Sequence, residues 1–361
     1  MNGGPAGSGP LRTGLIGAGR MGSFHAATLA TRLHCTELVA IADADEERAA
    51  SLAADLGVPG VYADPGDLLA DEQVEAVVIA APARVHAALV LGALEAGKAV
   101  FCEKPMAVTS EEAEQVVEAA RGSGLAVQVG FNRRFARDFV AAREAVANGE
   151  LGSVHLLRSL TRDPGLAAPE RVAPWTIFLE TLIHDFDMLA FLNPGASAVE
   201  VFALADALVA PAYKEHGLLD TAMVTIRFDN GALAVAEASF SAVYGYDVRA
   251  EVFGSGGMVT AGAPERGAAV RYSAAGALQE TVRADTELFA DAYVAELSAF
   301  AAAVQGGVPS AVGPADAQAA LGIALACAES VRRHAPVRVA GERASTGPRA
   351  VEGSEATTLT P

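Results

Sequence analysis

The chain has 361 residues, 52% of them hydrophobic, and its 44 acidic against 26 basic side chains give a formal net charge of −18. Nucleic acid is bound through an excess of Lys and Arg that this chain lacks, so no nucleic-acid partner is expected. No apolar run approaches the roughly 20 residues that cross a bilayer, and the three cysteines form neither a disulfide framework nor a metal-ligand spacing. Because the N-terminus also lacks a secretory signal pattern, we expect a cytoplasmic protein with no membrane partner.

Short apolar runs alternate with helical segments over the first 130 residues. Strands are predicted at Leu11–Ile16, Leu38–Ala42, near Val61, and at Ala76–Ala81, Ala99–Cys102 and Ala126–Val129, with helices between them that include Asp45–Leu56, Gly66–Ala70, Val85–Ala96 and Ser110–Gly122. Strands that alternate with helices form a parallel sheet with right-handed crossovers. Residues 11–130 are therefore predicted to form a Rossmann domain, a doubly wound parallel α/β sheet.

After Gly130 the pattern changes to longer strand-like segments. A helix at Arg134–Asn148 is followed by predicted strands at Val154–Thr161, Ala198–Leu208, Thr221–Phe228, Ala232–Phe240 and Arg249–Phe253, and by helices at Thr286–Val304 and Pro314–Arg332. Asn230-Gly231 between two strand runs predicts a hairpin. Residues 131–340 are therefore predicted to be an α+β domain with a largely antiparallel open sheet. Residues 1–10 and 341–361 have little to bury and are predicted to be disordered.

A glycine-rich turn, Gly17-Ala18-Gly19-Arg20-Met21-Gly22, connects the first predicted strand to a helix. Such glycines let the backbone approach a pyrophosphate, and the N-terminus of the helix offers unpaired N–H groups. Asp43 ends the second strand, 21 residues after Gly22, where an acid can accept the ribose hydroxyls. An acid at this position repels a 2′-phosphate, so the pattern favours NAD, while the nearby cations Arg20 and Arg48 leave NADP open.

A second group of polar residues lies in the predicted helix Phe178–Leu192. At about 100° per residue, Glu180, His184 and Asp187 fall on one face of this helix. The stripe can be a solvated surface, a metal site, or a proton-transfer site in which a carboxylate orients the imidazole. Without cysteines or a second histidine cluster nearby, no metal is predicted.

Four motifs, in this order and spacing, resemble the Gfo/Idh/MocA family of NAD(P)-dependent oxidoreductases: the glycine-rich turn, Glu103-Lys104-Pro105, residues 130–135 (GFNRRF), and the segment Glu180–Asp187. The resemblance covers residues 11–335. The second half is most similar to inositol 2-dehydrogenases, at residues 161–164, 183–187, 244–247 and 251–255. The resemblance implies that residues 131–340 bind substrate and assemble the chain into a homo-oligomer, a dimer or tetramer.

The resemblance also implies a catalytic set of Lys104, Glu180 and His184. In the family, the lysine reaches the substrate hydroxyl beside the nicotinamide, and the proline after it is commonly cis; the alternative for Lys104 is an exposed loop lysine. The sequence departs from the inositol dehydrogenase pattern at two points. Glu180 stands where those enzymes have Asp, and Trp175-Thr176 replaces a pair of glycines.

These features predict NAD-dependent oxidation of a secondary ring hydroxyl of a cyclitol, such as myo-inositol, to the ketone. His184 would take the proton and Lys104 would stabilise the oxygen, or the reverse, with Glu180 orienting the imidazole. The alternatives are a dehydrogenase of a sugar or amino-cyclitol intermediate, and a non-catalytic NAD-binding sugar sensor. The predicted cofactor-binding residues are Gly17, Gly19, Arg20, Met21, Gly22, Asp43, Ala81, Pro82, Glu103 and Lys104, and the predicted substrate-binding residues are Arg133, Asp163, Asp187 and Tyr246. His86 is predicted either to face the nicotinamide or to cap a helix.

Overall fold

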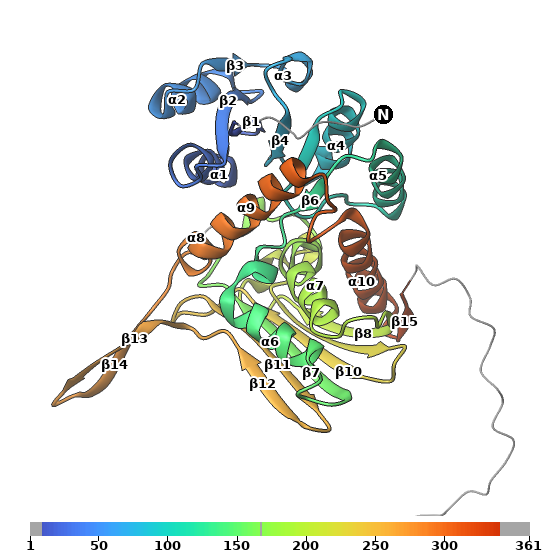
Figure 1. Cartoon of the computed structure of the whole chain (residues 1–361). Coiled ribbons are helices and arrows are strands. Elements are labelled where there is room, and N and C mark those ends of the chain that lie inside the picture. The colour runs from blue at the N-terminus through green and yellow to red at the C-terminus, as the bar shows by residue number, and fades with distance from the viewer. Residues whose placement is uncertain (1–8, 167, 340–361) are drawn as a thin grey trace, which may run out of the picture.

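The computed structural model describes residues 9–166 and 168–339, which form two large sheets with helices packed around them (Figure 1). The disorder predicted for residues 1–10 and 341–361 falls outside the described residues, apart from Gly9 and Pro10. No helix in the described ranges is long and apolar enough to cross a membrane.

The first sheet has six parallel strands in the order β3-β2-β1-β4-β5-β6. These are β1 Leu11–Ile16, β2 Thr36–Ala42, β3 Gly60–Tyr62, β4 Ala76–Ile79, β5 Ala99–Cys102 and β6 Val127–Val129. The helices between them are α1 Arg20–Thr31, α2 Glu46–Leu56, α3 Pro65–Ala70, η1 Ala83–Val85, α4 His86–Glu95 and α5 Ser110–Ser123. This strand order is that of the doubly wound fold predicted from the sequence.

Burial explains why these runs form the centre of the sheet. Every residue of β4 and of β5 is buried, which is the pattern of parallel strands covered by helices on both faces. Local signals fix the flanking helices: Thr109 and Glu112 form a reciprocal capping box at the start of α5. Gly124, in the left-handed region, follows its end.

The second sheet has seven strands in the order β12-β11-β7-β10-β9-β8-β15. They are β7 Val154–Arg162, β8 Ala198–Asp206, β9 Thr221–Phe228, β10 Leu233–Ser239, β11 Asp247–Gly254, β12 Gly257–Ala261 and β15 Val337–Arg338. Only β7 and β10 pair in parallel, so the sheet is largely antiparallel as predicted. The hairpin predicted at Asn230-Gly231 is confirmed by the antiparallel pairing of β9 with β10.

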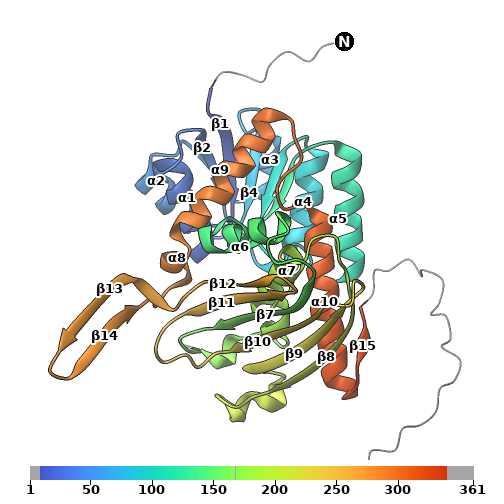
Figure 2. The same cartoon turned by 60° about the horizontal axis from the view of Figure 1, so that its bottom comes forward.

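The remaining helices are η2 Asn132–Phe135, α6 Arg137–Ala147, η3 Pro169–Arg171, η4 Ile177–Thr181, α7 Ile183–Phe191, η5 Pro211–His216, α8 Asp285–Leu288, α9 Ala290–Gly306 and α10 Pro314–Arg333. The helices α7 and α10 cover one face of the second sheet, whose other face is open (Figure 2). In contrast, α9 packs on the first sheet, where Leu297 and Phe300 join the same buried cluster as Leu15 and Phe101. A separate hairpin of β13 Glu265–Ser273 and β14 Gly276–Thr281 extends away from both sheets (Figures 1 and 2).

Several predicted bounds are corrected by the structure. The expected single helix Phe178–Leu192 is a π-helical turn, η4, followed by α7, so the spacing of 100° per residue does not hold across it. The predicted helix Arg134–Asn148 is divided between η2 and α6, and Thr286–Val304 is interrupted at Phe289. The strands β12 to β15 were not predicted. The described side chains of β13 and β14 are largely exposed, so this pair has no clear apolar alternation.

Candidate functional site

The predicted cofactor residues lie at the carboxyl ends of four neighbouring strands. The turn Gly17–Gly22 follows β1, Asp43 follows β2, Ala81 and Pro82 follow β4, and Glu103 and Lys104 follow β5. The strand order runs in opposite directions on the two sides of β1 and β4, and open parallel sheets bind ligands at such a switch point.

The three glycines of the turn are required for different reasons. Gly17 has φ +99°, and a Cβ there would lie 2.7 Å from the Ala80 carbonyl; at Gly22, a Cβ would overlap the Gly17 oxygen. These two glycines are needed by the fold itself. At Gly19 a Cβ would meet nothing within 4 Å, so protein packing does not explain the missing side chain. The open space in front of Gly19 fits a group that approaches the backbone from outside.

The start of α1 supports the same interpretation. Gly19 is its N-cap and provides no side-chain cap, and the first turn contains no acidic residue. The first N–H groups of this 12-residue helix therefore have neither a capping oxygen nor a nearby negative charge. A helix end of this kind attracts an anion. The residues present thus fit a dinucleotide pyrophosphate.

Asp43 is held as a charged group at the end of β2. Its Oδ2 accepts from the Ala18 amide at 2.6 Å, and its Oδ1 accepts from the Asp45 amide and an Arg48 N–H, both at 2.8 Å. Burial would raise the pKa of Asp43, but these hydrogen bonds, led by the one from Arg48, outweigh burial and lower that pKa. Asp43 is therefore an ionised acceptor at the position where ribose hydroxyls would bind.

The Glu103-Lys104-Pro105 turn is fixed on several sides. The Lys104–Pro105 peptide is cis, as the family resemblance implies. The ring of His86, at the start of α4, lies 2.8 Å from the Pro105 oxygen and 2.6 Å from the Ala81 oxygen, so it joins this turn to the end of β4. His86 is buried in this position. The Lys104 ammonium donates to the backbone oxygen of Glu180 at 2.9 Å, which connects this turn to η4 across the site.

Lys104 lines a cavity of about 270 Å³ between the two sheets. The cavity is lined by Arg20, Lys104, Asn132, Arg133, Thr161, Asp163, Leu166, Val172, Thr176, Glu180, Thr181, His184, Phe240, Tyr246, Val248, Asp285, Phe289 and Tyr293. The structure thus brings together the whole predicted catalytic set and three of the four predicted substrate-binding residues. The exception among these four is Asp187.

His184 is a neutral base at neutral pH. Burial, followed by the positive charges of Arg133 and Lys104, lowers the pKa of His184 well below its usual value. Its Nδ1 has no hydrogen-bond partner among the described residues, and the Phe131 ring packs edge-on against the imidazole at a centroid distance of 5.9 Å. A neutral imidazole has a lone pair free to accept a proton.

Glu180 lines the cavity, but its carboxylate does not hydrogen-bond His184. The residue is exposed and belongs to the π-helical turn η4, whose geometry differs from the α-helix assumed for the sequence. The expected orientation of the imidazole by Glu180 is therefore not found among the described residues. The contact with Lys104 is made by the Glu180 backbone instead.

Trp175 precedes this π-helical turn in an unusual conformation. Its φ is +67°, in the left-handed region that favours glycine, which is consistent with the glycine pair of the inositol dehydrogenases. The indole stacks on Phe178 at 6.4 Å, and the Arg332 guanidinium lies 4.4 Å from its ring centroid. These contacts fix the segment that carries Thr176 and Glu180 into the cavity wall.

Arg133 is oriented by one residue of the cavity wall and by others behind it. Its guanidinium donates to Asp185 at 3.2 Å and to Thr161 Oγ1 at 2.8 Å, and the Asp185 carboxylate also accepts from Ser159 at 2.5 Å. Asp185 is fully buried. Sequence reasoning missed Asp185 as a positioning residue, although its place directly after His184 was visible.

Asp163 and Tyr246 form a pair on the second-sheet side of the cavity. Burial raises the pKa of Asp163 to about 6, although the positive charge of Arg133 opposes the shift. The Tyr246 hydroxyl donates to Asp163, and burial followed by the Asp163 charge raises the pKa of Tyr246. The pair can offer both a donor and an acceptor to a polyol.

Asp187 lies outside the cavity. It is fully buried, and Arg134 contacts both of its oxygens, at 2.6 Å and 2.9 Å. Arg134 also contacts Asp316 on α10 at 3.2 Å. The prediction that Asp187 binds substrate is therefore corrected, because its carboxylate is used in an ion pair between η2, α7 and α10.

Sequence reasoning also missed Asp285 and Tyr293, which come to the cavity from α8 and α9. Asp285 accepts two hydrogen bonds from Arg20 in the glycine-rich turn, at 2.9 Å and 3.2 Å, and so connects the two halves of the site. The two residues are 265 positions apart in the chain, so no local pattern could reveal their contact. Met21, predicted to bind cofactor, packs partly buried against the core.

Comparison with known proteins agrees with this geometry. A family model described as "Oxidoreductase family, NAD-binding Rossmann fold" matches residues 11–131, and one described as "GFO/IDH/MocA C-terminal domain" matches residues 139–260. The chain belongs to the Gfo/Idh/MocA oxidoreductase family. Its first sheet is accordingly an NAD-binding Rossmann fold, and NAD is its cofactor.

Relatives within the Gfo/Idh/MocA family are similar over almost the whole chain. The myo-inositol 2-dehydrogenase of Thermotoga maritima is 36% identical, over 91% of this chain and 98% of that protein. The scyllo-inositol 2-dehydrogenase (NAD(+)) of Bacillus subtilis is 33% identical, over 93% and 98%. The crystal structure of scyllo-inositol dehydrogenase from Lactobacillus casei with bound NAD(H) and scyllo-inositol is similar with a TM-score of 0.88 at 28% identity, over 92% of this chain and all of that one.

Proposed function

We propose that this oxidoreductase removes a hydride from a secondary ring hydroxyl of a cyclitol and passes it to NAD, leaving a ketone. The observation that carries this proposal is the convergence of Lys104, His184 and the Asp163–Tyr246 pair on one cavity at the carboxyl edge of the Rossmann sheet. The inositol dehydrogenases among its relatives support the choice of substrate class.

The cofactor would be held by residues at the edge of the first sheet. Gly17, Gly19 and Gly22 leave the backbone accessible to the pyrophosphate, and Asp43 accepts the ribose hydroxyls. Met21, Ala81, Pro82 and Glu103 would complete the surroundings of the dinucleotide. When bound, NAD supplies a hydride acceptor at C4 of its nicotinamide.

Side chains of the cavity would accept the proton of the substrate hydroxyl and stabilise its oxygen. In the oxidation, the C–H bond breaks with its electron pair, the O–H proton goes to the neutral imidazole of His184, and a C=O bond forms. The Lys104 ammonium would donate a hydrogen bond to the oxygen while negative charge develops on it. Glu180 stays in the proposed catalytic set, and its backbone oxygen holds the Lys104 ammonium at the cavity wall.

Substrate hydroxyls would bind to Arg133, Asp163 and Tyr246. Asp163 can accept, Arg133 can donate, and Tyr246 can do both, which suits a ring that carries several hydroxyls. Two features favour a substrate different from that of the inositol dehydrogenases: Glu180 has one more methylene than Asp, and Trp175 replaces a glycine. An amino-cyclitol is therefore the second candidate, because the carboxylate of Glu180 has no partner among the described residues and would pair with an ammonium group.

The test is NADH formation with myo-inositol, scyllo-inositol, an amino-cyclitol, glucose and xylose, using NAD or NADP. Lys104→Ala and His184→Ala should each reduce kcat by at least 100-fold. Lys214→Ala, which removes an exposed lysine that does not line the cavity, is the control and should keep full activity. Turnover only with the amino-cyclitol would favour the second candidate. NAD binding without turnover of any substrate would favour a sensor.

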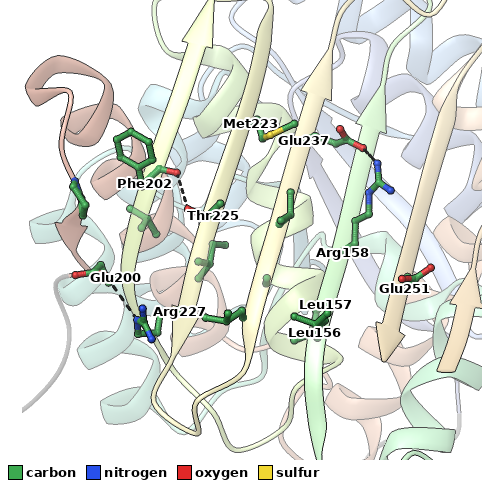
Figure 3. A pocket seen from close by; sticks show the side chains of 16 residues that line it. Leu156, Leu157, Arg158, Glu200, Phe202, Met223, Thr225, Arg227, Glu237 and Glu251 are labelled. Carbon is green, nitrogen blue, oxygen red and sulfur yellow. Dashed lines mark hydrogen bonds and ion pairs between the residues drawn. The ribbon is translucent and has the colours of Figure 1, made fainter. Parts of the chain in front are cut away.

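We also propose that the open face of the second sheet assembles two copies of the chain. It exposes apolar side chains along neighbouring strands, namely Leu156, Leu204, Met223, Leu233, Phe253 and Met258. A shallow groove runs over this face, and Figure 3 shows Leu156 and Met223 among its lining residues. Exposed apolar patches of this kind mark protein contacts.

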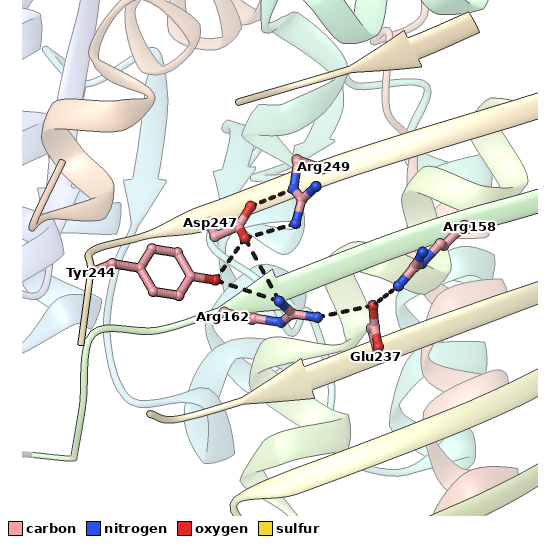
Figure 4. Close-up of polar contacts among 6 residues, drawn as sticks. All are labelled: Arg158, Arg162, Glu237, Tyr244, Asp247 and Arg249. Atoms are coloured by element: carbon pink, nitrogen blue, oxygen red, sulfur yellow. Dashed lines mark hydrogen bonds and ion pairs between the residues drawn. The ribbon is translucent and has the colours of Figure 1, made fainter. Parts of the chain in front are cut away.

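Several of the charges on this open face are already paired within the chain. Glu237 contacts Arg158 at 2.5 Å and Arg162 at 3.3 Å, and Asp247 contacts Arg249 at 2.7 Å (Figure 4). A second copy could cover them without leaving an unpaired charge. Met223→Glu, which adds a charge at this face, should therefore reduce the mass measured by sedimentation equilibrium to that of a monomer. An unchanged mass would rule this face out.

Two further predictions remain proposals. We propose domains at residues 11–130 and 131–340, supported by family models of which the first ends at residue 131 and the second begins at residue 139.

A cytoplasmic location is proposed from cysteines that are free in the structure. Fractionation of the cells that produce the protein would test it.

A further inference from the structure

Three titratable side chains meet beneath the Glu103-Lys104 turn, behind the proposed active site. His25 comes from α1, Glu103 from the end of β5 and Glu296 from α9, and one ligand-type atom of each lies within 4.8 Å of the other two. All three residues are buried, and His25 and Glu296 have no exposed surface at all. Nothing in the proposed reaction requires a second buried acid here.

The two carboxyl groups are paired very differently. Glu103 lies 2.7 Å from His25 Nε2 through one oxygen and accepts from the Lys104 amide at 3.1 Å through the other. Neither carboxyl oxygen of Glu296 has a hydrogen-bond partner among the described residues. A negative charge on Glu296 would be very unfavourable, because this carboxylate would be buried without a partner and would lie beside a second carboxylate, that of Glu103.

We propose that Glu296 carries a proton and points it at the Glu103 carboxylate, directly after a rotation of its side chain or through one buried water molecule. The cluster then has a single negative charge, on Glu103, between two donors, Glu296 and His25. Burial and the nearby Glu103 both raise the pKa of Glu296 well above its usual value, in agreement with this assignment. Besides His25 and Glu103, the titratable group that faces Glu296 is Tyr293 on the same helix.

The proposed proton would affect catalysis through Glu103. A Cβ at Gly130 would lie 3.1 Å from the second Glu103 oxygen, so the carboxylate is tightly packed where it accepts from the Lys104 amide. Glu296 is thus a positioning residue that holds Glu103, and through it the Lys104 turn. This positioning role rests on the proposed function of Lys104. The proposal that Glu296 carries a proton does not depend on that function.

A metal ion is the other occupant that such ligands suggest. Zinc takes bonds of about 2.0–2.1 Å in a tetrahedral arrangement, which separates its ligand atoms by about 3.3 Å. His25 Nε2 and Glu103 Oε1 are only 2.7 Å apart, the distance of a direct hydrogen bond. The geometry therefore favours a shared proton.

The first test is the pH dependence of stability. Above about pH 5 the unfolded chain would release this proton and the folded chain would keep it, so rising pH destabilises the folded state. Between pH 6 and pH 8 we expect the unfolding constant of the wild type to rise by about tenfold per pH unit more than that of Glu296→Gln. The control Glu118→Gln, which removes an exposed carboxylate on α5, should follow the wild type. Parallel curves for the wild type and Glu296→Gln would overturn the proposal.

The second test is independent of unfolding and of activity. The infrared spectrum of the wild type at pH 8 should contain the carbonyl band of a protonated carboxylic acid. Asp163 and Asp187, with pKa values of about 6, are ionised at this pH. The band should be missing from Glu296→Gln and present in Glu118→Gln. A wild type without this band, or with a stoichiometric metal ion in elemental analysis, would also overturn the proposal.

The positioning role has a kinetic test. Glu296→Gln keeps a hydrogen-bond donor to Glu103 and should retain kcat to within about threefold, whereas Glu296→Met removes the donor and should reduce kcat by about tenfold or more. The Kd for NADH should stay the same in both. Equal loss in the two variants would contradict the positioning role while leaving the infrared result valid.

Discussion

Replacing Gly19 by Ala should separate binding of the cofactor from stability of the fold. The Gly19 backbone has φ −73° and ψ −167°, which alanine adopts readily, and a Cβ there would meet no protein atom within 4 Å. Alanine is a weaker helix N-cap than glycine but restricts the unfolded chain, and each effect is worth about 0.5–1 kcal/mol. Because the two effects oppose each other, the free energy of unfolding should change by less than about 1 kcal/mol.

Binding of NAD should respond much more strongly to Gly19→Ala. The added methyl group would stand in the space through which the pyrophosphate approaches the first N–H groups of α1. A hydrogen bond to a charged group is worth about 1.5–3 kcal/mol, so the loss of one such contact should raise the Kd by about 10- to 150-fold. Gly22→Ala provides the contrast, because its Cβ would overlap the Gly17 oxygen and should destabilise the protein even without nucleotide.

Two measurements decide this prediction. Fluorescence titration with NADH gives the Kd, and thermal unfolding without nucleotide gives the stability. The reasoning would be refuted if Gly19→Ala bound NADH as tightly as the wild type, or if it lowered the melting temperature as much as Gly22→Ala did. The first result would mean that the open space at Gly19 is not the pyrophosphate site.

Three further predictions follow from the carboxylates. Asp43→Ala should raise the Kd for NAD and lower the preference for NAD over NADP by at least tenfold, because Arg48 loses its hydrogen-bonded partner, keeps only the longer 3.8 Å contact with Asp45, and becomes available to a 2′-phosphate. Unchanged cofactor selectivity would argue against Asp43 at the ribose. The KM for the polyol should rise as pH falls through about 6, where Asp163 gains a proton and becomes a weaker acceptor for hydroxyls, and Asp163→Asn should abolish this pH dependence. Asp187→Asn should destabilise the protein by about 3–5 kcal/mol in urea unfolding, since it leaves the buried Arg134 poorly paired. The KM should stay unchanged. A raised KM without loss of stability would instead support Asp187 as a substrate-binding residue.

Local signals in the sequence were sufficient to predict the strands of the first sheet and the cofactor site at their carboxyl ends. The apolar runs from Leu11 to Val129 predicted the parallel strands because strands buried on both faces are continuously hydrophobic. The glycine-rich turn and Asp43 predicted an NAD site because both are fixed by their position directly after a strand. These features depend on neighbours within about 20 residues, which is the range that a single sequence reveals.

Tertiary structure decided the composition of the site. The π-helical turn at Ile177–Thr181 placed Glu180 at the exposed cavity wall, and the burial of Asp187 against Arg134 removed it from the substrate site. Asp285 reached the cavity from α8, and Glu296 reached the cluster behind it from α9, through contacts with residues far away in the chain. The sequence by itself therefore determined the type of fold and cofactor, which follow from local periodicity and turns. Folding alone decided which charges are paired, since a charge finds its partner through the packing of distant segments.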